Sequence, residues 1–377
     1  MEKIITELLD IHTPGEIEIS DTKTWDYIIE FCSYHELYPI LFTKFNHLLP
    51  PEKQNLLKSA YYLSIARNMV LMDEFLKLKM ELQTRGIQFL PLKGIDFLNT
   101  IYPDFNLRSM ADIDILVPEN KVNDCEATLK ALGYKKILGG VKENYWIKYH
   151  CHFMYGKTSS GMNIHLELHW ALDFKRFQNI SFEHLWTRRR KITAEDTEIY
   201  VLSPEDTLIA LALHQRRFHK PLILKNIIDG YLILKNYNID WGYLMDTAYR
   251  YRLRVTLNLL LNVIEEVYGI NFKHIKDSLR VKNFADRIQN KIIRNYIYNT
   301  EMFTNYHIQK RIYFYLYFFL YDSWWELLYY LFFISPEKFA KFFNLPIYSF
   351  KNNLCYKLRL FYVPFKFLSL FLRVKCK

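Results

Sequence analysis

The sequence predicts an α+β protein in which a small mixed sheet with helices is flanked by helical regions on its N- and C-terminal sides. Two observations lead to this fold class. Apolar residues recur at helical spacing in residues 25–85 and again beyond residue 203, and short apolar runs of strand length separate these two regions. At 377 residues the chain is long enough for two or three packed units. We expect four regions: an N-terminal helical region (1–85), a sheet-containing core (86–192), a helical domain (193–305) and an aromatic, basic C-terminal helical region (306–377).

The predicted core alternates strands with helices. The N-terminal helices end at Gly86, after which IQFLPL predicts a strand and GIDFLNTIY a short helix. DIDILV predicts a second strand that stops before Pro118, and the amphipathic segment ENKVNDCEATLKALGYKK predicts a helix that ends at Gly133. Two more strands are predicted at YHCHFMYG and NIHLELHW, with turn residues 159–161 between them. The helical pattern resumes at SPED, residues 203–206, where Ser and Pro are typical of a helix start.

Net charge and cysteine spacing indicate which partners and which cellular compartment to expect. The formal net charge of +10 favours polyanions such as nucleotides, nucleic acid or anionic lipid. The five cysteines are scattered without disulfide or zinc spacing, and the N-terminus lacks the pattern of a secretory signal, so we expect reduced thiols and a cytoplasmic protein. The most apolar segment, residues 312–334, is interrupted by Asp322, Ser323 and Glu326, so we expect a buried or interfacial helix rather than a membrane span.

The C-terminal stretch, residues 351–377, carries seven Lys or Arg residues and no acid, interleaved with Leu, Phe and Tyr. A basic, aromatic helix of this kind can lie on an anionic membrane surface, which would make the protein membrane-peripheral. The alternative is a terminal helix that packs its apolar stripe on the body of the protein. The sequence leaves both open.

Carboxylates gather on two of the predicted strands. In DIDIL, Asp112 and Asp114 are two residues apart, so both side chains project from one face of the strand. Paired carboxylates repel one another unless a cation lies between them, and Mg²⁺ or Mn²⁺ with substrate phosphates is suited to such a pair. In NIHLELHW, His165, Glu167 and His169 also share a face, and Glu167 could be a metal ligand or a general base. The alternative for the Asp pair is a solvated strand end.

Three residues near the Asp pair are candidate phosphate contacts. Lys93 and Gly94 end one predicted strand and open a helix, where backbone N–H groups and the helix dipole favour an anion. Arg108, four residues before Asp112, supplies a fork-shaped donor. Each has a structural alternative: a surface lysine, a turn glycine, and an arginine paired with Asp104.

The ordered motifs LKG, YPD, RSMADIDILV, LELHW and SPEDTLIALALH, followed by IIDG, resemble a family of bacterial proteins described as uncharacterised nucleotidyltransferases. The family belongs to the superfamily whose palm resembles that of DNA polymerase β, and the likeness runs from the N-terminal helices to IDWGYLMDTAYRYRL. It implies a metal site on Asp112, Asp114 and Glu167, phosphate contacts from Lys93, Gly94 and Arg108, and transfer of a nucleotidyl group from an NTP. Further family positions, possible supports of the site, are matched by His169, His214 and Asp229. Unlike many members of the superfamily, this chain has no Gly-Ser or Gly-Gly in the phosphate loop, which leaves the mode of triphosphate binding and the choice of nucleotide open.

Other motifs give weaker indications of function. HLELH lies on a predicted strand and therefore lacks the helical spacing of a zinc protease motif, and the run His150-Cys151-His152 is expected to be structural. The basic runs RRRK, residues 188–191, and HQRRFHK, residues 214–220, would suit an acceptor's phosphates or a solvated surface. No recognised nucleic-acid-binding motif is present, and we expect no stable DNA binding.

We therefore expect a metal-dependent enzyme that uses Mg²⁺ or Mn²⁺ and an NTP, with a protein, RNA or small-molecule acceptor that the sequence does not select. One alternative is a catalytically silent nucleotide-binding module that acts through partners or a membrane-docking tail. The complete acid triad argues against it, because a silent protein would be expected to lose clustered charges. Another is a toxin-like transferase that modifies tRNA.

Overall fold

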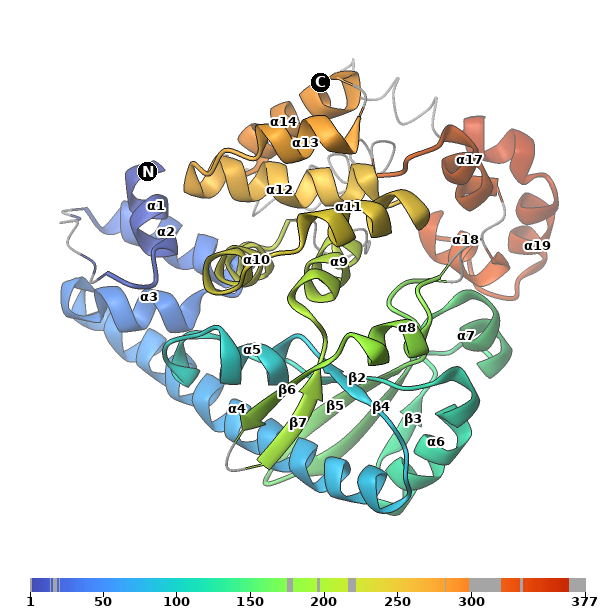
Figure 1. The fold of residues 1–377 in the computed structure, drawn as a ribbon, viewed down its shortest axis with the longest axis horizontal. Coiled ribbons are helices and arrows are strands. Elements are labelled where there is room, and N and C mark those ends of the chain that lie inside the picture. Colours follow the sequence, from blue (N-terminus) through green and yellow to red (C-terminus); the bar gives the residue numbers. More distant parts are fainter. Residues whose placement is uncertain are drawn as a thin grey trace.

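The structure is a computed structural model that describes residues 2–13, 15, 19, 21–174, 179–194, 197–215, 222–281, 283–297, 320–332 and 335–365. A mixed five-stranded sheet lies in one half of the molecule and a group of helices in the other (Figure 1). The α+β fold class predicted from the sequence is confirmed.

The sheet has the strand order β1-β2-β5-β4-β3. Its strands are β1 (Leu90–Leu92), β2 (Ile113–Leu116), β3 (Lys135–Ile137), β4 (His152–Ser159) and β5 (Met162–His169). The central strands β2 and β5 are parallel, and their register sets Asp114 opposite Glu167. All other pairs are antiparallel, and the β4–β5 hairpin sets His152 opposite His169. The sheet therefore brings residues of β2, β4 and β5 that are distant in sequence next to one another.

The N-terminal helices divide between the two halves of the molecule. They are α1 (Glu2–Leu9), α2 (Thr22–His35), α3 (Tyr38–Phe45), the 3-10 helix η1 (Asn46–Leu48) and the long α4 (Pro51–Thr84). The second half of α4 buries Leu71, Phe75 and Leu78 in one apolar core with Ile113 and Ile115 of β2. Helices α1 to α3 instead share a core with the helices that follow the sheet. Helix α4 thus connects the two cores.

Short elements complete the sheet half. They are α5 (Gly94–Thr100), η2 (Phe105–Leu107), η3 (Glu119–Lys121), α6 (Val122–Ala131), α7 (Glu143–Tyr149), α8 (Phe182–Thr187) and the hairpin of β6 (Arg190–Ala194) and β7 (Thr197–Val201). The predicted strands at IQFLPL, DIDILV, YHCHFMYG and NIHLELHW correspond to β1, β2, β4 and β5. Strand β3, helices α7 and α8 and the β6–β7 hairpin were not predicted, because their short segments show little periodicity in the sequence.

The second half is helical. Its helices are α9 (Pro204–His214), α10 (Leu224–Asn236), α11 (Trp241–Arg250), α12 (Arg254–Tyr268), α13 (Lys273–Leu279) and α14 (Asn283–Ile297), followed by α17 (Trp324–Phe332), α18 (Pro336–Phe342) and α19 (Phe350–Lys357). Helix α9 begins as predicted, because the Ser203 hydroxyl accepts a hydrogen bond from the Asp206 N–H and Pro204 occupies the first turn. Helix α12 buries consecutive residues from Val255 to Ile264 and is the centre of this half.

The apolar segment 312–334 lies only partly within the described residues. Of its residues, 312–319 and 333–334 lie outside them, and the described part contains α17. Among the residues that the structure describes, no helix combines the length and the apolar character needed to cross a bilayer.

Candidate active site

Three carboxylates meet where β2 and β5 run side by side. Asp112 directly precedes β2, Asp114 lies within it, and Glu167 lies opposite Asp114 on β5. Because side chains alternate along a strand, Asp112 and Asp114 project to the same side. Carboxylate oxygens of all three residues lie within 4.8 Å of one another. The parallel register therefore assembles the acid cluster that was expected from the two sequence segments.

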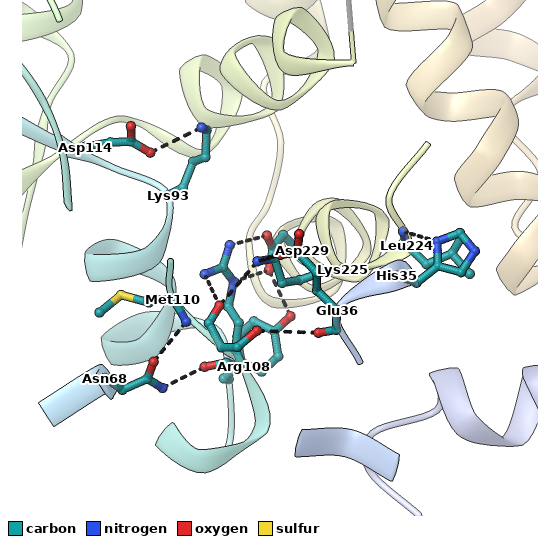
Figure 2. Close-up of polar contacts among 12 residues, drawn as sticks. His35, Glu36, Asn68, Lys93, Arg108, Met110, Asp114, Leu224, Lys225 and Asp229 are labelled. Atoms are coloured by element: carbon teal, nitrogen blue, oxygen red, sulfur yellow. Dashed lines mark hydrogen bonds and ion pairs between the residues drawn. The ribbon is translucent and has the colours of Figure 1, made fainter. Parts of the chain in front are cut away.

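Three positively chargeable groups contact the acids. Lys93 Nζ lies 3.2 Å from Asp114 Oδ2 (Figure 2). His169 Nε2 lies 3.1 Å from Asp114 Oδ1 and 3.1 Å from Glu167 Oε2, so this imidazole bridges the two strands. On β4, His152 Nε2 lies 3.6 Å from Glu167 Oε1. The acids thus form the centre of a cluster that reaches from the end of β1 to β4.

Burial and mutual repulsion control protonation in this cluster. Burial, followed by the neighbouring Asp114 charge, raises the pKa of Asp112 to about 7. Burial alone would lower the pKa of His169, but hydrogen bonds led by the one to Asp114 outweigh it and raise the pKa to about 10. Protons on Asp112 and His169 thus offset part of the clustered negative charge. A divalent cation would offset it more completely.

The backbone that leads into Asp112 is fastened to α4. The Asn68 side chain is almost fully buried; its amide donates to the Arg108 carbonyl at 2.7 Å and accepts from the Met110 N–H at 2.9 Å (Figure 2). Met110 in turn packs on Gly94, where a Cβ atom would lie 2.6 Å from the Met110 Sδ. The Gly94 backbone and the Met110 side chain are therefore closely packed, and this contact joins the Lys93-Gly94 turn to the segment before Asp112. Lys93 has a positive φ of 52°, so this turn is also conformationally unusual.

Arg108 does not reach the acids. Its Nε and Nη2 atoms each donate to one oxygen of Asp229 on α10 at 2.8 Å, and Tyr102 Oη donates to Asp229 Oδ1 at 2.8 Å (Figure 2). The ring of Phe97 lies beneath the guanidinium group, with its centroid 5.2 Å from Cζ. Burial alone would lower the pKa of Arg108, but Asp229 outweighs it and the pKa is raised. Both of these expected site residues thus join the sheet half to the helical half.

The alternative predicted for Arg108 was a pair with Asp104, and the structure shows Asp229 as the partner instead. The Asp104 side chain accepts from the Asn106 N–H at the start of η2. The fork geometry predicted for Arg108 is present, but it is directed to a carboxylate of the protein. Asp229 therefore engages Nε and Nη2, while Nη1 donates to the Ser109 carbonyl and lies 3.4 Å from the position that a Cβ atom would take at Gly94. The phosphate contact expected of Arg108 stays a prediction.

Sequence reasoning missed a second link, between α2 and α10. Lys225 Nζ contacts the Glu36 carboxylate and donates to the Ser109 carbonyl, one residue after Arg108. The Leu224 N–H donates to His35 Nδ1 at 3.2 Å. Burial, more than the nearby Arg108 charge, lowers the pKa of Lys225, whose own charge acts on Asp112. No motif marks these residues, because their partners lie far apart in the sequence.

The remaining candidates lie outside the acid cluster or at its margin. His165 shares the face of Glu167 but is exposed and lies opposite Gly156. His214 ends α9, next to residues 216–221, which lie outside the described residues together with most of the HQRRFHK run. In the RRRK run, Arg188 contacts Glu205 and Arg190 contacts Asp96. These arginines are therefore held by acids of the protein itself.

The donor set suits a hard divalent cation. Carboxylate oxygens are the ligands that Mg²⁺ and Mn²⁺ take, usually with substrate phosphates completing the shell. Asp112, Asp114 and Glu167 supply such oxygens from two adjacent strands, and the Glu167 side chain remains 15% exposed. The residues present thus fit a cation that a substrate can approach.

The comparison with protein families agrees with the expected class. The sequence model of a family described as "Uncharacterised nucleotidyltransferase" matches residues 21–269. A search of curated proteins finds no match. Among solved structures, ANT(2″)-Ia in complex with adenylyl-2″-tobramycin is 14% identical, with a TM-score of 0.34 over 48% of this chain and 97% of that chain. An antigenic nucleotidyltransferase-like protein from Paracoccidioides brasiliensis is also 14% identical, with a TM-score of 0.34 over 57% of this chain and 92% of that chain.

Proposed function

Since the chain belongs to the family of uncharacterised nucleotidyltransferases, we propose that it transfers a nucleotidyl group from a nucleoside triphosphate to a hydroxyl group of an acceptor. The observation that carries this proposal is the meeting of Asp112, Asp114 and Glu167, whose carboxylate oxygens lie within 4.8 Å of one another. Clustered, partly buried acids of this kind destabilise a fold unless a ligand compensates them, so they are candidates for a functional site.

The reaction is an in-line displacement at the α-phosphorus. The acceptor oxygen forms a bond to the α-phosphorus, the bond from that phosphorus to the bridging oxygen of the β-phosphate breaks, and pyrophosphate leaves. The proton of the acceptor hydroxyl passes to a carboxylate, and Glu167 is suited to receive it because its side chain is 15% exposed beside the Asp pair. Catalysis of this type depends mainly on positioning and on electrostatic stabilisation.

Cations bound to Asp112, Asp114 and Glu167, Mg²⁺ or Mn²⁺, would neutralise charge on the phosphates and on the leaving group. The residues of the chain supply the rest. With cations bound, Asp112 and Asp114 would hold the triphosphate beside β2. Lys93, whose Nζ lies 3.2 Å from Asp114 Oδ2, is placed to contact a phosphate oxygen in the same space. Gly94 allows the backbone of this turn to approach Met110 and keeps Lys93 beside the acids.

Labelled nucleotides test this proposal. Purified protein with Mg²⁺ or Mn²⁺ would be incubated with each NTP, labelled with ³²P at either the α or the γ position, and with total RNA, a protein lysate or a small-metabolite extract. We expect α-label on one acceptor class and release of γ-label as pyrophosphate, with neither seen for Asp112→Asn/Asp114→Asn. Transfer of γ-label to the acceptor would instead indicate a phosphotransferase.

The same experiment separates the alternatives. Metal-dependent NTP binding without transfer to any pool would favour a nucleotide-binding module that acts through partners. Transfer to tRNA, with growth arrest on expression that Asp114→Ala abolishes, would favour a toxin-like enzyme. Without NTP binding, the family would describe the fold and not the activity.

A further inference from the structure

Two histidines extend the acid cluster along β4 and β5. His152 begins β4 and His169 ends β5, and the hairpin register places them directly opposite each other. Their ring centroids are 4.6 Å apart. Glu167, two residues before His169 on the same strand, lies on the same face. The result is an imidazole, a carboxylate and a second imidazole that converge from two strands.

We propose that His152, Glu167 and His169 bind a second cation, a divalent transition metal of the Mn²⁺ or Zn²⁺ type, next to the site assigned to Asp112 and Asp114. The inference rests on the proposed function in one respect, because it takes the Asp pair as the neighbouring metal site. Carboxylate oxygens of Glu167 lie within 4.8 Å of the ligand atoms of the Asp pair and of those of the two histidines. Glu167 would therefore be shared between the two metal sites.

The distances between the candidate ligand atoms support this site. Metal–nitrogen and metal–oxygen bonds of about 2.1 Å place ligand atoms roughly 3.0 to 3.4 Å apart around one ion. His169 Nε2 lies 3.1 Å from Glu167 Oε2, and His152 Nε2 lies 3.6 Å from Glu167 Oε1. Each imidazole therefore directs its Nε2 atom towards an oxygen of Glu167. The two nitrogen–oxygen distances are close to those between ligand atoms around one ion.

Contacts on the side of the His152 ring that faces away from Glu167 also help to orient it. Its Nδ1 lies 3.6 Å from the Sγ of Cys151, which is buried, and its ring meets that of His150 edge to face at 4.4 Å. Histidines that bind metals are usually fixed through their other ring nitrogen in this way. The contacts at Nδ1 leave Nε2 directed towards Glu167. The sequence run His150-Cys151-His152 thus has a structural part, as expected, and also supplies one ligand atom.

The chemistry of the donors sets the class of ion. Mg²⁺ prefers oxygen ligands and holds its water tightly, whereas imidazole suits borderline transition metals. The Asp pair offers oxygen only, and the second site offers two nitrogens and one carboxylate. The two positions should therefore differ in metal preference. A run of His150, Cys151 and His152 could hold an ion on the other side of His152, but it lacks the carboxylate charge that Glu167 provides.

Magnetic resonance of bound Mn²⁺ tests the inference directly. Mn²⁺ would be added to the full-length protein, and hyperfine coupling between the manganese electron spin and ligand ¹⁴N nuclei would be measured in frozen solution. We expect coupling to two imidazole nitrogens. Coupling to fewer than two, or an absence of bound Mn²⁺, would overturn the proposal, and this test on the native protein needs no variant.

Variants identify the ligands. Each of His152→Gln and His169→Gln should remove one coupled nitrogen and raise the Mn²⁺ dissociation constant by about 10-fold or more, since even the loss of groups that only orient a ligand costs about 10–100-fold. His165→Gln is the matched control, because His165 lies on the same face of β5 but is exposed, and it should retain both couplings. Retention of both nitrogens in His152→Gln/His169→Gln would overturn the assignment.

The readout is independent of nucleotidyl transfer. Nitrogen coupling in a protein that transfers no label would leave the metal site standing and remove the proposed activity. Suppose instead that the protein transfers label with Mg²⁺ but its bound Mn²⁺ shows no nitrogen coupling. The proposed activity would then stand and the second metal site would be removed.

Discussion

Two clusters of charged side chains include residues of the segment that leads into β2, and they differ in how their charges are balanced. In the Arg108 cluster, which we define as Arg108, Asp229, Lys225 and Glu36, each cation has an anion as partner. In the acid cluster of Asp112, Asp114 and Glu167, three carboxylates meet Lys93 and His169 and adjust by protonation. Figure 2 shows the Lys93–Asp114 pair set apart from the Arg108–Asp229 pair.

The difference distinguishes a cluster whose charges are satisfied within the fold from a cluster that is a candidate ligand site. Arg108 and Asp229 are buried, and the fork-to-carboxylate geometry satisfies both charges within the protein. The acid cluster approaches charge balance only by holding protons on Asp112 and His169 beside Lys93, and part of Glu167 remains exposed. Groups that destabilise a fold are candidates for binding a ligand, so we propose the acid cluster as the site and the Arg108 cluster as its support.

The largest expected effect is on activity at Asp112. Asp112→Asn removes one charge from the acid cluster, and we expect nucleotidyl transfer to fall by about 100- to 1,000-fold, the scale of a lost electrostatic contact at a reacting centre. Stability at pH 8 should stay the same or rise, because the repulsion from Asp114 that helps raise the pKa of Asp112 is removed. Transfer rates and urea unfolding check this pair of outcomes, and unchanged transfer would place the site elsewhere.

The opposite result is expected at Asp229. Asp229→Asn leaves the buried Arg108 charge without its counter-ion, which should lower the free energy of unfolding by about 3–5 kcal/mol. The exposed pair Lys191–Glu198 is the matched control, and Glu198→Gln should leave the free energy of unfolding nearly unchanged. Chemical denaturation measures both. If Asp229→Asn were as stable as the native protein, the Arg108 cluster would not be structural.

A smaller loss of stability is expected at Asn68. Asn68→Ala removes the buried amide that bonds the Arg108 carbonyl and the Met110 N–H, at a cost of about 1–3 kcal/mol. Hydrogen exchange in residues 108–112 should increase, since this amide fastens that segment to α4. Unchanged exchange there would show that other contacts hold the segment.

The pH dependence of metal binding sharpens the comparison. Folded Asp112 keeps its proton up to about pH 7, whereas a carboxyl group in the unfolded chain loses it near pH 4. In chelator-treated protein its contribution to stability is therefore greatest at low pH and is lost as the pH rises towards 7. Metal requires the ionised form, so the affinity of the oxygen-only Asp pair for Mg²⁺ should rise about tenfold per pH unit up to pH 7 and then level off. Calorimetric titration between pH 5.5 and 8.5 measures this, and Asp112→Asn should flatten the profile.

The smallest expected effect concerns the C-terminal region. Phe350 and Phe361 are 82% and 78% exposed, and lysines and arginines lie beside them in the sequence. We predict that removal of residues 351–377 reduces pelleting with anionic liposomes and leaves pelleting with neutral liposomes unchanged. Equal pelleting before and after truncation would favour a tail that serves only in packing.

The sequence was informative where chemistry follows from local spacing. Alternation along a strand predicted that Asp112 and Asp114 share a face and that Glu167 shares one with His165 and His169, and the apolar runs predicted four of the five sheet strands. The pairing of β2 with β5 depends on how the whole sheet assembles, so only the structure sets Asp114 opposite Glu167.

Long-range partners could not be predicted from one sequence. Arg108 and Asp229 are separated by 121 residues, and local spacing offered a phosphate or Asp104 as partner instead. The approach of His152 to His169 requires the register of the β4–β5 hairpin. Strand β3 escaped prediction because it is the short sequence KKI, whose two lysines lack the apolar alternation of a buried strand.

The central claim, that the acid cluster holds a metal-bound nucleotide, can be measured without knowledge of the acceptor. Binding of an α,β-methylene NTP, which cannot be cleaved at the reacting bond, would be titrated with and without Mg²⁺ against the native protein and against folded Asp112→Asn/Asp114→Asn. We predict Mg²⁺-dependent binding by the native protein and none by the variant. Equal binding by the two proteins, or no binding by the native protein, would contradict the account.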